Sequence, residues 1–469
     1  MSWFAAFGAP REHGFEPLRL EGALPADLAG TLVRTGPSLF ACAGRPYRHW
    51  FDGDGAVSAV RFAEGRAFGA IRVVETPGLL EERRAGRPLH PAYGTLPPGV
   101  PRPYPRPKNA ANTSVMRWNE RWFALHEAGA PIEIARDDLS TLGECDLGCP
   151  AIRDGFGAHP HAARGALYNV GMRYGAVTEL DVFELRGEQT ARITTIKLAG
   201  PSMVHDFAVT DRHLIVFVPP LRLNQRELAR GLVSYSDALE WAPAFGTEIV
   251  IVPLDDPGAS TRVTVDPFYQ WHFANAFERG PEIVVDFVRY ADFSSNAWYA
   301  SLTTGRPAPD VRQGTLSRAT IEPQARRFRC EPCSATVAEF PQVAPLVEAR
   351  PHRFVYVTSH SSPIAAVSGP QDRISRIDVE RAAQVDVVLG REHYPSEPIF
   401  VARGPAEDDG WILSLVYDGS THASYVAVLD AAHLDAGPIA RAWFDHHIPL
   451  TLHGIWTGQR GCLPLAPGR

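Results

Sequence analysis

The chain has 469 residues, of which 45% are hydrophobic and 21% charged, and this composition is typical of a globular protein rather than a disordered one. Its net charge is −7 and its arginines are scattered, which excludes the basic stripe of a nucleic-acid-binding protein. No run of about 18 apolar residues occurs, so we expect no membrane-spanning helix. The first residues lack the basic and apolar regions of a secretory signal peptide, so we expect a cytoplasmic protein.

Short apolar stretches rich in β-branched and aromatic residues recur along the chain, separated by Gly, Pro, Asp and Asn. They predict strands at 56–62, 122–126, 166–171, 213–218, 248–252, 282–288, 354–358, 411–417 and 425–429. Helical periodicity is weak and predicts helices only at 225–239 and 373–379. Serial sandwiches or a propeller would fit such an all-β chain. We favour the propeller because it leaves little exposed strand edge and directs one strand of each blade to a common axis.

Four histidines lie in short apolar or aromatic contexts along this series of strands. They are His159 (AHP), His205 (MVHDF), His272 (WHFAN) and His453 (LHGIW). A histidine among apolar neighbours loses hydration and needs a hydrogen-bond partner or a metal. These four are too far apart for a local metal finger, so they form one site only if the fold brings distant strands together.

Three glutamates in apolar surroundings are candidates to support such a metal site: Glu127, Glu339 and Glu397. Four neutral imidazoles leave the charge of a divalent metal uncompensated. Carboxylates that accept the distal ring N–H offset that charge and fix the ring tautomer. An all-imidazole ligand set suits iron, copper or zinc.

We do not assign the remaining histidines or the cysteines to a metal site. His161 follows a proline and lacks the apolar flank of the chosen four, so we leave it out of the ligand set. Cys145, Cys149, Cys330 and Cys333 could be drawn as a zinc site, but their spacing matches no known finger. We interpret them, with Cys42 and Cys462, as reduced thiols.

Several motifs in chain order resemble those of the carotenoid cleavage oxygenase family, non-haem iron enzymes that cut polyene double bonds with oxygen. They are 30–37 (GTLVRTGP), 49–55 (HWFDGDG), 108–113 (KNAANT), the four histidine contexts, 397–400 (EPIF) and 407–410 (EDDG). Each is weak alone, but their order along nearly the whole chain is specific.

The resemblance implies a single domain over 1–469, a seven-bladed β-propeller capped by a dome of loops and short helices. It implies Fe(II) on the axis, held by His159, His205, His272 and His453. It further implies that Glu127, Glu339 and Glu397 hydrogen-bond three of these ligands, namely His205, His272 and His453, in a pairing that the sequence does not fix. Thr113 matches a position that crowds one open iron site in some members.

The implied reaction is the addition of O2 across an alkene of a lipophilic polyene, giving aldehydes or an aldehyde and a ketone. Candidate residues of an apolar substrate tunnel are Phe51, Trp271, Phe273, Phe277, Trp298, Tyr299 and Trp456. Each of these is equally compatible with ordinary core packing.

The substrate expected from the resemblance is an apocarotenoid or carotenoid, and a stilbenoid is the alternative. The stilbenoid-cleaving branch carries a Lys directly before the first of the three glutamates, where this chain has His126, and a Tyr that we do not find within 74–80. A non-catalytic propeller scaffold is disfavoured because all seven site residues are present. We expect a monomer that contacts a membrane peripherally, with the segment 219–244 as one candidate surface.

Overall fold

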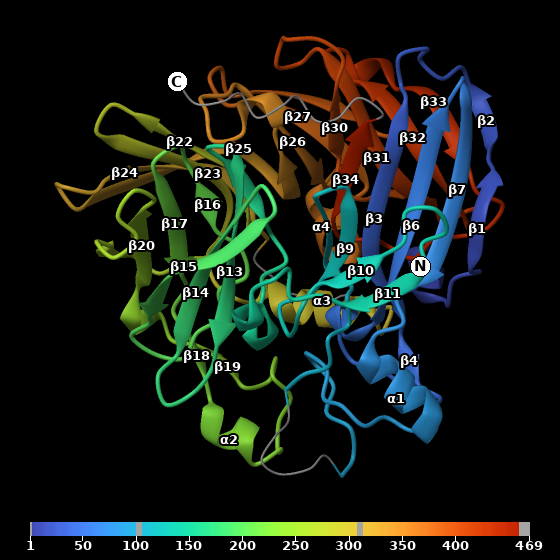
Figure 1. The fold of residues 1–469 in the computed structure, drawn as a ribbon. Helices are drawn as coiled ribbons and strands as arrows, with labels where there is room; N and C mark the ends of the chain where they lie inside the picture. The colour runs from blue at the N-terminus through green and yellow to red at the C-terminus, as the bar shows by residue number, and fades with distance from the viewer. Residues whose placement is uncertain (1, 100–105, 307–312, 459–469) are drawn as a thin grey trace.

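The strands form antiparallel sheets arranged around the middle of the molecule in a computed structural model that describes residues 2–99, 106–306 and 313–458 (Figure 1). The first sheet consists of β1 (His13–Pro17), β7 (Arg66–Val73), β6 (Asp54–Ala63), β3 (Gly30–Leu39) and β34 (Gly454–Gly458). The next consists of β11 (Thr141–Glu144), β10 (Ile132–Ile134), β9 (Arg121–Leu125) and β8 (Ser114–Trp118). Since β34 pairs with β3, the two ends of the described chain meet in one sheet.

Two further four-stranded sheets follow in the chain. One contains β12 (His161–Ala163), β13 (Ala166–Arg173), β14 (Glu179–Arg186) and β15 (Gln189–Lys197). The other contains β16 (Ala208–Val209), β17 (His213–Val218), β20 (Thr247–Pro253) and β21 (Thr261–Val265). In both, successive strands along the sheet are antiparallel neighbours.

The largest sheet is built around one long strand, β25 (Arg327–Gln342). Its other strands are β22 (Tyr269–Arg279), β23 (Glu282–Tyr290), β24 (Thr315–Glu322), β26 (Phe354–Ser359), β27 (Arg373–Asp378) and β28 (Ala383–Val387). The first part of β25 pairs with β24 and its last residues pair with β26. One strand thereby joins two four-stranded halves.

A six-stranded sheet completes the set. It contains β2 (Arg19–Gly22), β33 (Pro438–Trp443), β32 (Ala423–Asp430), β31 (Gly410–Asp418), β29 (His393–Pro395) and β30 (Ile399–Ala402). Two short hairpins, β4 (Ala41–Cys42) with β5 (Arg45–Pro46) and β18 (Leu221–Leu223) with β19 (Leu239–Trp241), lie outside these sheets. The consecutive strands β1 and β2 belong to different sheets, so the N-terminal segment links the first sheet to the last.

Helices are short and few among the described residues: α1 (Pro77–Ala85), α2 (Gln225–Ala229), α3 (Ser295–Leu302) and α4 (Pro363–Ser368). Short 3-10 helices occur at Ser2–Phe7, Trp50–Asp52, Pro150–Asp154, Pro243–Phe245, Pro345–Val347 and Leu434–Ala436. Helix α1 begins where Thr76 Oγ1 accepts the N–H of Leu79, and it ends at Gly86, whose φ of 62° is left-handed. None of the helices in the described ranges has the length and apolar character that a membrane crossing requires.

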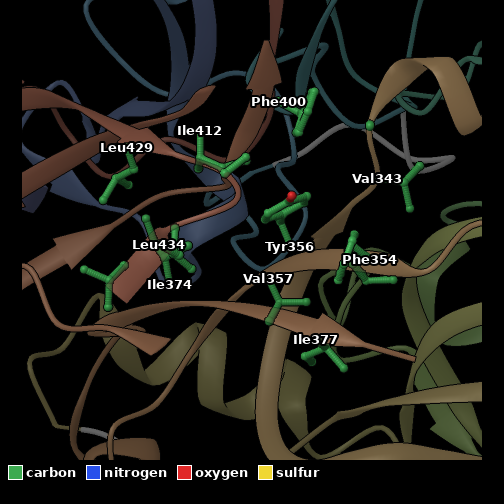
Figure 2. Packing of buried hydrophobic residues seen from close by; sticks show 14 of the residues in the cluster. Val343, Phe354, Tyr356, Val357, Ile374, Ile377, Phe400, Ile412, Leu429 and Leu434 are labelled. Atoms are coloured by element: carbon green, nitrogen blue, oxygen red, sulfur yellow. The ribbon is translucent and has the colours of Figure 1, made fainter. Parts of the chain in front are cut away.

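Sheets pack face to face, which explains why so many strands are apolar on both sides. All nine residues of β31 are buried. Figure 2 shows one of the resulting clusters of buried apolar side chains, which includes Tyr356 and Val357 of β26, Ile374 and Ile377 of β27 and Ile412 of β31. Such burial stabilises the fold by about 25 cal/mol per Å² of apolar surface removed from water.

The predicted all-β class is confirmed, and each of the nine predicted strands overlaps a strand of the structure. The helix predicted at 373–379 is wrong, because those residues form β27, whose backbone pairs with β26 and β28. The helix predicted at 225–239 is wrong in extent, since α2 ends at Ala229 and residues 239–241 form β19. Helices α1, α3 and α4 were not predicted.

Candidate metal centre

The four histidines predicted as a metal set lie together, although they come from separate parts of the chain. His272 is in β22, while His159, His205 and His453 lie in the turns just before β12, β16 and β34. The Nε2 atom of His205 is 3.0 Å from that of His159 and 3.4 Å from that of His272. The ring of His453 lies 4.6 Å from that of His159 and 4.7 Å from that of His272.

Each of the three predicted glutamates reaches one of these rings at the opposite nitrogen. His205 Nδ1 is 2.6 Å from Glu127 Oε1, His272 Nδ1 is 2.6 Å from Glu339 Oε2, and His453 Nδ1 is 2.8 Å from Glu397 Oε1. A carboxylate accepts a hydrogen bond, so these rings carry their proton on Nδ1 and present an unprotonated Nε2 to the cluster. Among the described residues, no carboxylate pairs with His159.

Burial and neighbouring charges act differently on the rings of the site. Burial lowers the pKa of His272, but the adjacent Glu339 outweighs burial and raises that pKa above its ordinary value. Burial, followed by the other three imidazoles, holds the pKa of His159 well below its ordinary value. Burial also lowers the pKa of His453. Burial alone would raise the pKa of Glu127, but the adjacent His205 lowers it to about 2.

A bulge in β25 places the second of these carboxylates. The strand register shifts between Glu339 and Gln342, and Phe340 adopts a left-handed φ of 53°, which is unfavourable for a bulky residue. The bulge turns the Phe340 ring against two of the histidines, with centroids 5.4 Å from His272 and 5.3 Å from His453. The backbone N–H of Phe340 donates to Glu339 Oε2 at 2.7 Å. Phe340 therefore donates a hydrogen bond to the Glu339 carboxylate and covers one side of the histidine cluster with its ring.

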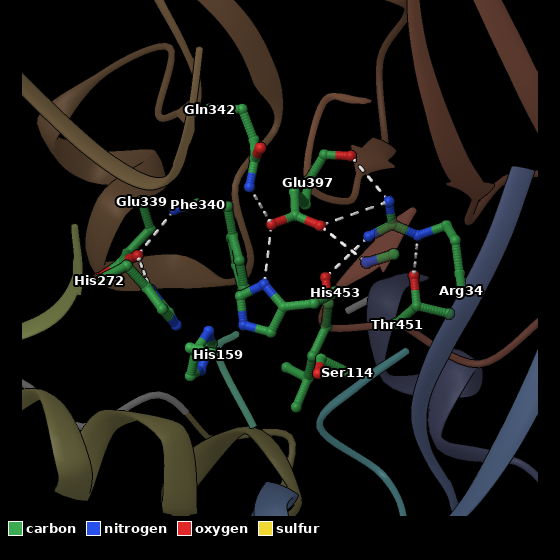
Figure 3. Close-up of polar contacts among 12 residues, drawn as sticks. Arg34, Ser114, His159, His272, Glu339, Phe340, Gln342, Glu397, Thr451 and His453 are labelled. Carbon is green, nitrogen blue, oxygen red and sulfur yellow. Dashed lines mark hydrogen bonds and ion pairs between the residues drawn. The ribbon is translucent and has the colours of Figure 1, made fainter. Parts of the chain in front are cut away.

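The carboxylates are themselves held by buried donors that were not predicted. Tyr290 Oη donates to Glu339 Oε1 at 2.6 Å, and Gln342 Nε2 donates to Glu397 Oε1 at 2.8 Å. Arg34 lies behind Glu397, with Nη1 donating to its backbone carbonyl at 2.9 Å and lying 3.9 Å from Oε2 (Figure 3). Arg34 belongs to the GTLVRTGP motif, and a single arginine within a buried strand was the signal that could have identified it.

Thr113 lies beside the cluster through its backbone. Its carbonyl accepts the N–H of His453 at 3.2 Å, and its own N–H donates to Leu125 O at 3.1 Å. Its hydroxyl donates to Asn112 Oδ1 at 3.1 Å, and the side chain is buried. The backbone of Thr113, just before β8, therefore fixes the position of His453, just before β34.

Aromatic side chains line one side of the cluster, and some but not all of the predicted ones are among them. The ring of Trp271 is 5.2 Å from that of His205, and Phe51 is 5.6 Å from Trp271. Trp298 and Tyr299 pack in the same group of side chains. Three of the predicted aromatic residues lie elsewhere. Phe273 is in the core between β17, β20 and β23. Phe277 packs on His352, and Trp456 packs on Phe62.

His161, which we left out of the ligand set, is engaged elsewhere: its Nε2 lies 2.9 Å from Asp206 Oδ1. In the described part of the chain, the groups of residues positioned to share a metal ion contain no cysteine. Cys42, Cys145, Cys149, Cys330 and Cys333 are free thiols, and Cys462 lies outside the described residues.

The donor set fits a divalent first-row transition metal. The ligand atoms of His159, His272 and His453 lie within 4.8 Å of one another, and Glu127, His159 and His205 form a second such group. Unprotonated imidazole nitrogens that face one another, with carboxylates behind them, are the arrangement that zinc, copper, iron and nickel prefer.

Comparison with known proteins identifies the family. The family model described as retinal pigment epithelial membrane protein matches residues 7–458. The chain is 32% identical to the apocarotenoid-15,15'-oxygenase of Synechocystis sp., over 95% of this chain and 94% of that protein. It is 25% identical to a carotenoid cleavage oxygenase of Mycobacterium tuberculosis, over 94% and 93% of the two chains. The crystal structure of cobalt-substituted Synechocystis ACO superimposes with a TM-score of 0.89 at 31% identity and covers 98% of each chain. The chain therefore belongs to the carotenoid cleavage oxygenase family that this model describes.

Proposed function

We propose that this protein is a non-haem Fe(II) dioxygenase that cleaves a carbon–carbon double bond of an apocarotenoid or carotenoid with O2, giving aldehyde or ketone products. The observation that carries the proposal is the meeting of four imidazoles whose Nε2 atoms face one another while three of them hydrogen-bond a carboxylate through Nδ1. The similarity to an apocarotenoid oxygenase across 95% of the chain supports the substrate class.

The residues that would hold Fe(II) are His159, His205, His272 and His453. Bound iron supplies the activation of O2, so no protein acid or base is required for the chemical step. Glu127, Glu339 and Glu397 keep the ligand nitrogens unprotonated and offset the metal charge. Phe340 excludes water from one side of the cluster, and we assign to Thr113 the restriction of access beside His453.

A row of aromatic rings supports a path for an apolar polyene from the surface to the cluster. Successive rings lie 5.2 to 6.0 Å apart, in the order His205, Trp271, Phe51, Tyr93, Tyr235 and Tyr174. Tyr174 is 41% exposed, so the row reaches the solvent. Flat rings of this kind bind a conjugated chain through stacking and apolar contact while fixing which bond lies beside the metal.

A stilbenoid is the alternative substrate, and the environment of His126 argues against it. Its Nδ1 accepts the N–H of Ala128 at 3.1 Å, and burial lowers its pKa. His126 is therefore a neutral imidazole and offers no positive charge to a phenolate. A lysine at this position would offer one.

We also propose that the sheets are the seven blades of a propeller formed by a single domain. The largest sheet divides at β25 into two blades. Five more blades among the described residues are the first sheet, the three four-stranded sheets and the six-stranded sheet. Pairing of β3 with β34 would close the ring. This arrangement accounts for the delivery of four histidines from distant segments to one axis.

Peripheral contact with a membrane is proposed at the surface formed by the 174–177 turn and the segment around α2. Exposed apolar side chains lie there, with Val177 51% and Leu232 54% exposed. Gln225 Nε2 donates to Gly175 O at 3.5 Å, and Tyr174 Oη lies 2.5 Å from Tyr235 Oη, so the two segments are neighbours. The aromatic row ends at the same place, which suits the delivery of a lipid-soluble substrate.

The test is a comparison of substrates in air with iron-loaded protein. Apocarotenals and carotenoids of several lengths and resveratrol-type stilbenes are incubated separately, and products are identified by mass. We expect aldehyde or ketone fragments from the polyenes. Products from the stilbenes alone would overturn the substrate class, and the absence of cleavage with every substrate would overturn the proposed reaction.

A further inference from the structure

One buried carboxylate, that of Asp206, accepts hydrogen bonds from three donors. Its Oδ1 accepts from His161 Nε2 at 2.9 Å and from the backbone N–H of Phe207 at 2.7 Å. Its Oδ2 accepts the backbone N–H of Phe273 at 2.8 Å. The Asp206 side chain is 2% exposed, and both phenylalanines are buried in the core. The contacts are therefore made inside the protein, between parts that have little freedom to move.

Each segment that meets at this carboxylate also carries one histidine of the candidate metal centre. His161 lies two residues after His159, and Asp206 directly follows His205. The contact through Oδ2 is to the residue that directly follows His272. One side chain thus connects the backbone beside three of the four histidines.

The backbone ladders do not join these three segments, because the segments belong to different sheets. β12, β16 and β22 each lie in a separate sheet, although β16 contacts both of the others. Ladder hydrogen bonds form between neighbouring strands of one sheet. β22 is also irregular at this point, since its register with β23 shifts on both sides of Phe273. The contacts of Asp206 therefore supply a link between sheets that the ladders do not provide.

A carboxylate serves this set of donors and an amide does not. Both oxygens of a carboxylate accept hydrogen bonds, whereas an amide accepts through its oxygen alone and its nitrogen donates. An amide at position 206 sets an N–H group against at least one of the three donors. At least one link between the segments is then lost, while the size of the side chain is unchanged.

We propose that Asp206 is a positioning residue of the metal centre, which holds the segments of His159, His205 and His272 at the separations that one iron ion requires. The inference rests on the proposed function, since it concerns the residues that would hold Fe(II). His159 depends on this link most, because no carboxylate pairs with its ring in the described part of the chain. The rings of the other two histidines each hydrogen-bond a glutamate.

The test compares Asp206→Asn with Asp181→Asn after the metal-free full chain has been loaded with Co²⁺. Asp181 is the matched control: it is 1% exposed, and it accepts from Arg173 and Thr195. It lies in β14, which β13 separates from β12. The visible absorption of Co²⁺ reports the number and geometry of its ligands, so it responds to a change in the site and not to a general loss of stability.

We expect Asp206→Asn to change this absorption and to bind Co²⁺ at least about tenfold more weakly than the parent. Asp181→Asn should match the parent in both measurements, although it also loses buried hydrogen bonds. His161→Ala is a second variant, because His161 is 23% exposed and its removal leaves the two backbone donors in place. It should show a smaller change of the same kind.

An Asp206→Asn protein with the Co²⁺ spectrum and affinity of the parent would overturn the inference. Equal changes in Asp206→Asn and Asp181→Asn would overturn it as well, since they would show a general effect of buried charge. If Asp206→Asn does not fold, His161→Ala decides, and a spectrum and affinity like those of the parent then count against the inference. A parent that binds no Co²⁺ would instead overturn the metal centre of the proposed function, and this inference with it.

Discussion

Arg34 and Glu397 form a buried ion pair directly behind His453: Nη1 lies 3.9 Å from Oε2, and both side chains are 1% exposed. Arg34 also donates from Nε to Thr451 Oγ1 at 2.8 Å and from Nη2 to Leu452 O at 2.7 Å. One arginine thus fixes both the carboxylate that orients His453 and the backbone that leads to it. The N-terminal strand β3 contributes to the candidate metal centre in this way without supplying one of its four histidines.

Replacement of Arg34 should therefore disturb both stability and metal retention. Arg34→Met removes the buried counter-charge of the Glu397 carboxylate and the donor to the Glu397 carbonyl, and we expect a loss of about 3–5 kcal/mol in the free energy of unfolding. Denaturant unfolding measures this loss. Arg83→Met is the matched control, because Arg83 pairs with Glu75 at 2.9 Å on the surface and should contribute less than about 1 kcal/mol. Equal losses in the two variants would contradict the role assigned to Arg34.

The carboxylate behind His272 should control how tightly iron is retained. Glu339 accepts from His272, Tyr290 and Phe340, and an amide at this position cannot accept from all three. We expect Glu339→Gln to fold but to lose iron roughly 10–100-fold more readily to a chelator. Metal analysis after dialysis measures this.

Glu278→Gln is the matched control for Glu339→Gln. Glu278 also accepts from a histidine, His213 Nδ1 at 3.0 Å, but far from the cluster. It should retain iron as the parent does. If Glu339→Gln retains iron equally well, Glu339 does not support the metal.

Acid should destabilise the fold partly through His49. Burial lowers the pKa of His49 to about 4, and its ring is neutral, accepting from Phe51 N at Nδ1 and donating to Asn296 O from Nε2. The unfolded chain binds a proton at this residue below its ordinary pKa of about 6.5, whereas the native chain does so only near 4. Stability is therefore fully present above pH 6.5 and falls by up to about 3 kcal/mol as the pH drops from 6.5 to 4.

His49→Gln should accordingly show a shallower loss of stability over this pH range than the parent, measured by urea unfolding at several pH values. His90→Gln, at a histidine paired with Glu81 on the surface, is the comparison. Parallel pH profiles for His49→Gln and the parent would show that His49 is not the group responsible.

Membrane contact should depend on the apolar side chains beside α2. Val177→Ser combined with Leu232→Ser removes two exposed apolar groups from that surface, and we expect roughly tenfold weaker co-sedimentation with phospholipid vesicles. Ile364→Ser, on α4 and 77% exposed, removes an exposed apolar group from another element and should change nothing. If the parent does not sediment with vesicles, or if all variants behave alike, this surface is not the contact.

The strands were predictable because local chemistry determines them. Runs such as 213–218 and 425–429 combine β-branched and aromatic residues with flanking turn residues, and they became β17 and β32. Segment 373–378 shows the limit: Ile374 and Ile377 are spaced as on one face of a helix, but pairing with β26 and β28 makes the segment a strand. Pairing with the neighbouring strands decides such a short segment, and the periodicity of the segment itself does not reveal that pairing.

The residue types of the candidate metal centre could be singled out from the sequence, but their connections could not. Apolar contexts singled out the histidines and glutamates, and the structure brings all seven together. The pairing of Glu127 with His205, rather than with another ring, follows from the positions of β9 and β16 and has no local signal. The same holds for Arg34 and Gln342, whose roles depend on contacts with Glu397, which lies 363 and 55 residues further along the chain.

The central claim, oxygen-dependent cleavage at the four-histidine centre, is tested most directly by product mass under labelled oxygen. Iron-loaded protein is incubated with an apocarotenal under ¹⁸O₂, and the fragments are analysed before their carbonyl groups exchange with water. The account predicts two carbonyl fragments that each carry one labelled oxygen, and no products from His205→Ala. Intact substrate with the iron-loaded parent, or equal cleavage by His205→Ala, would contradict it.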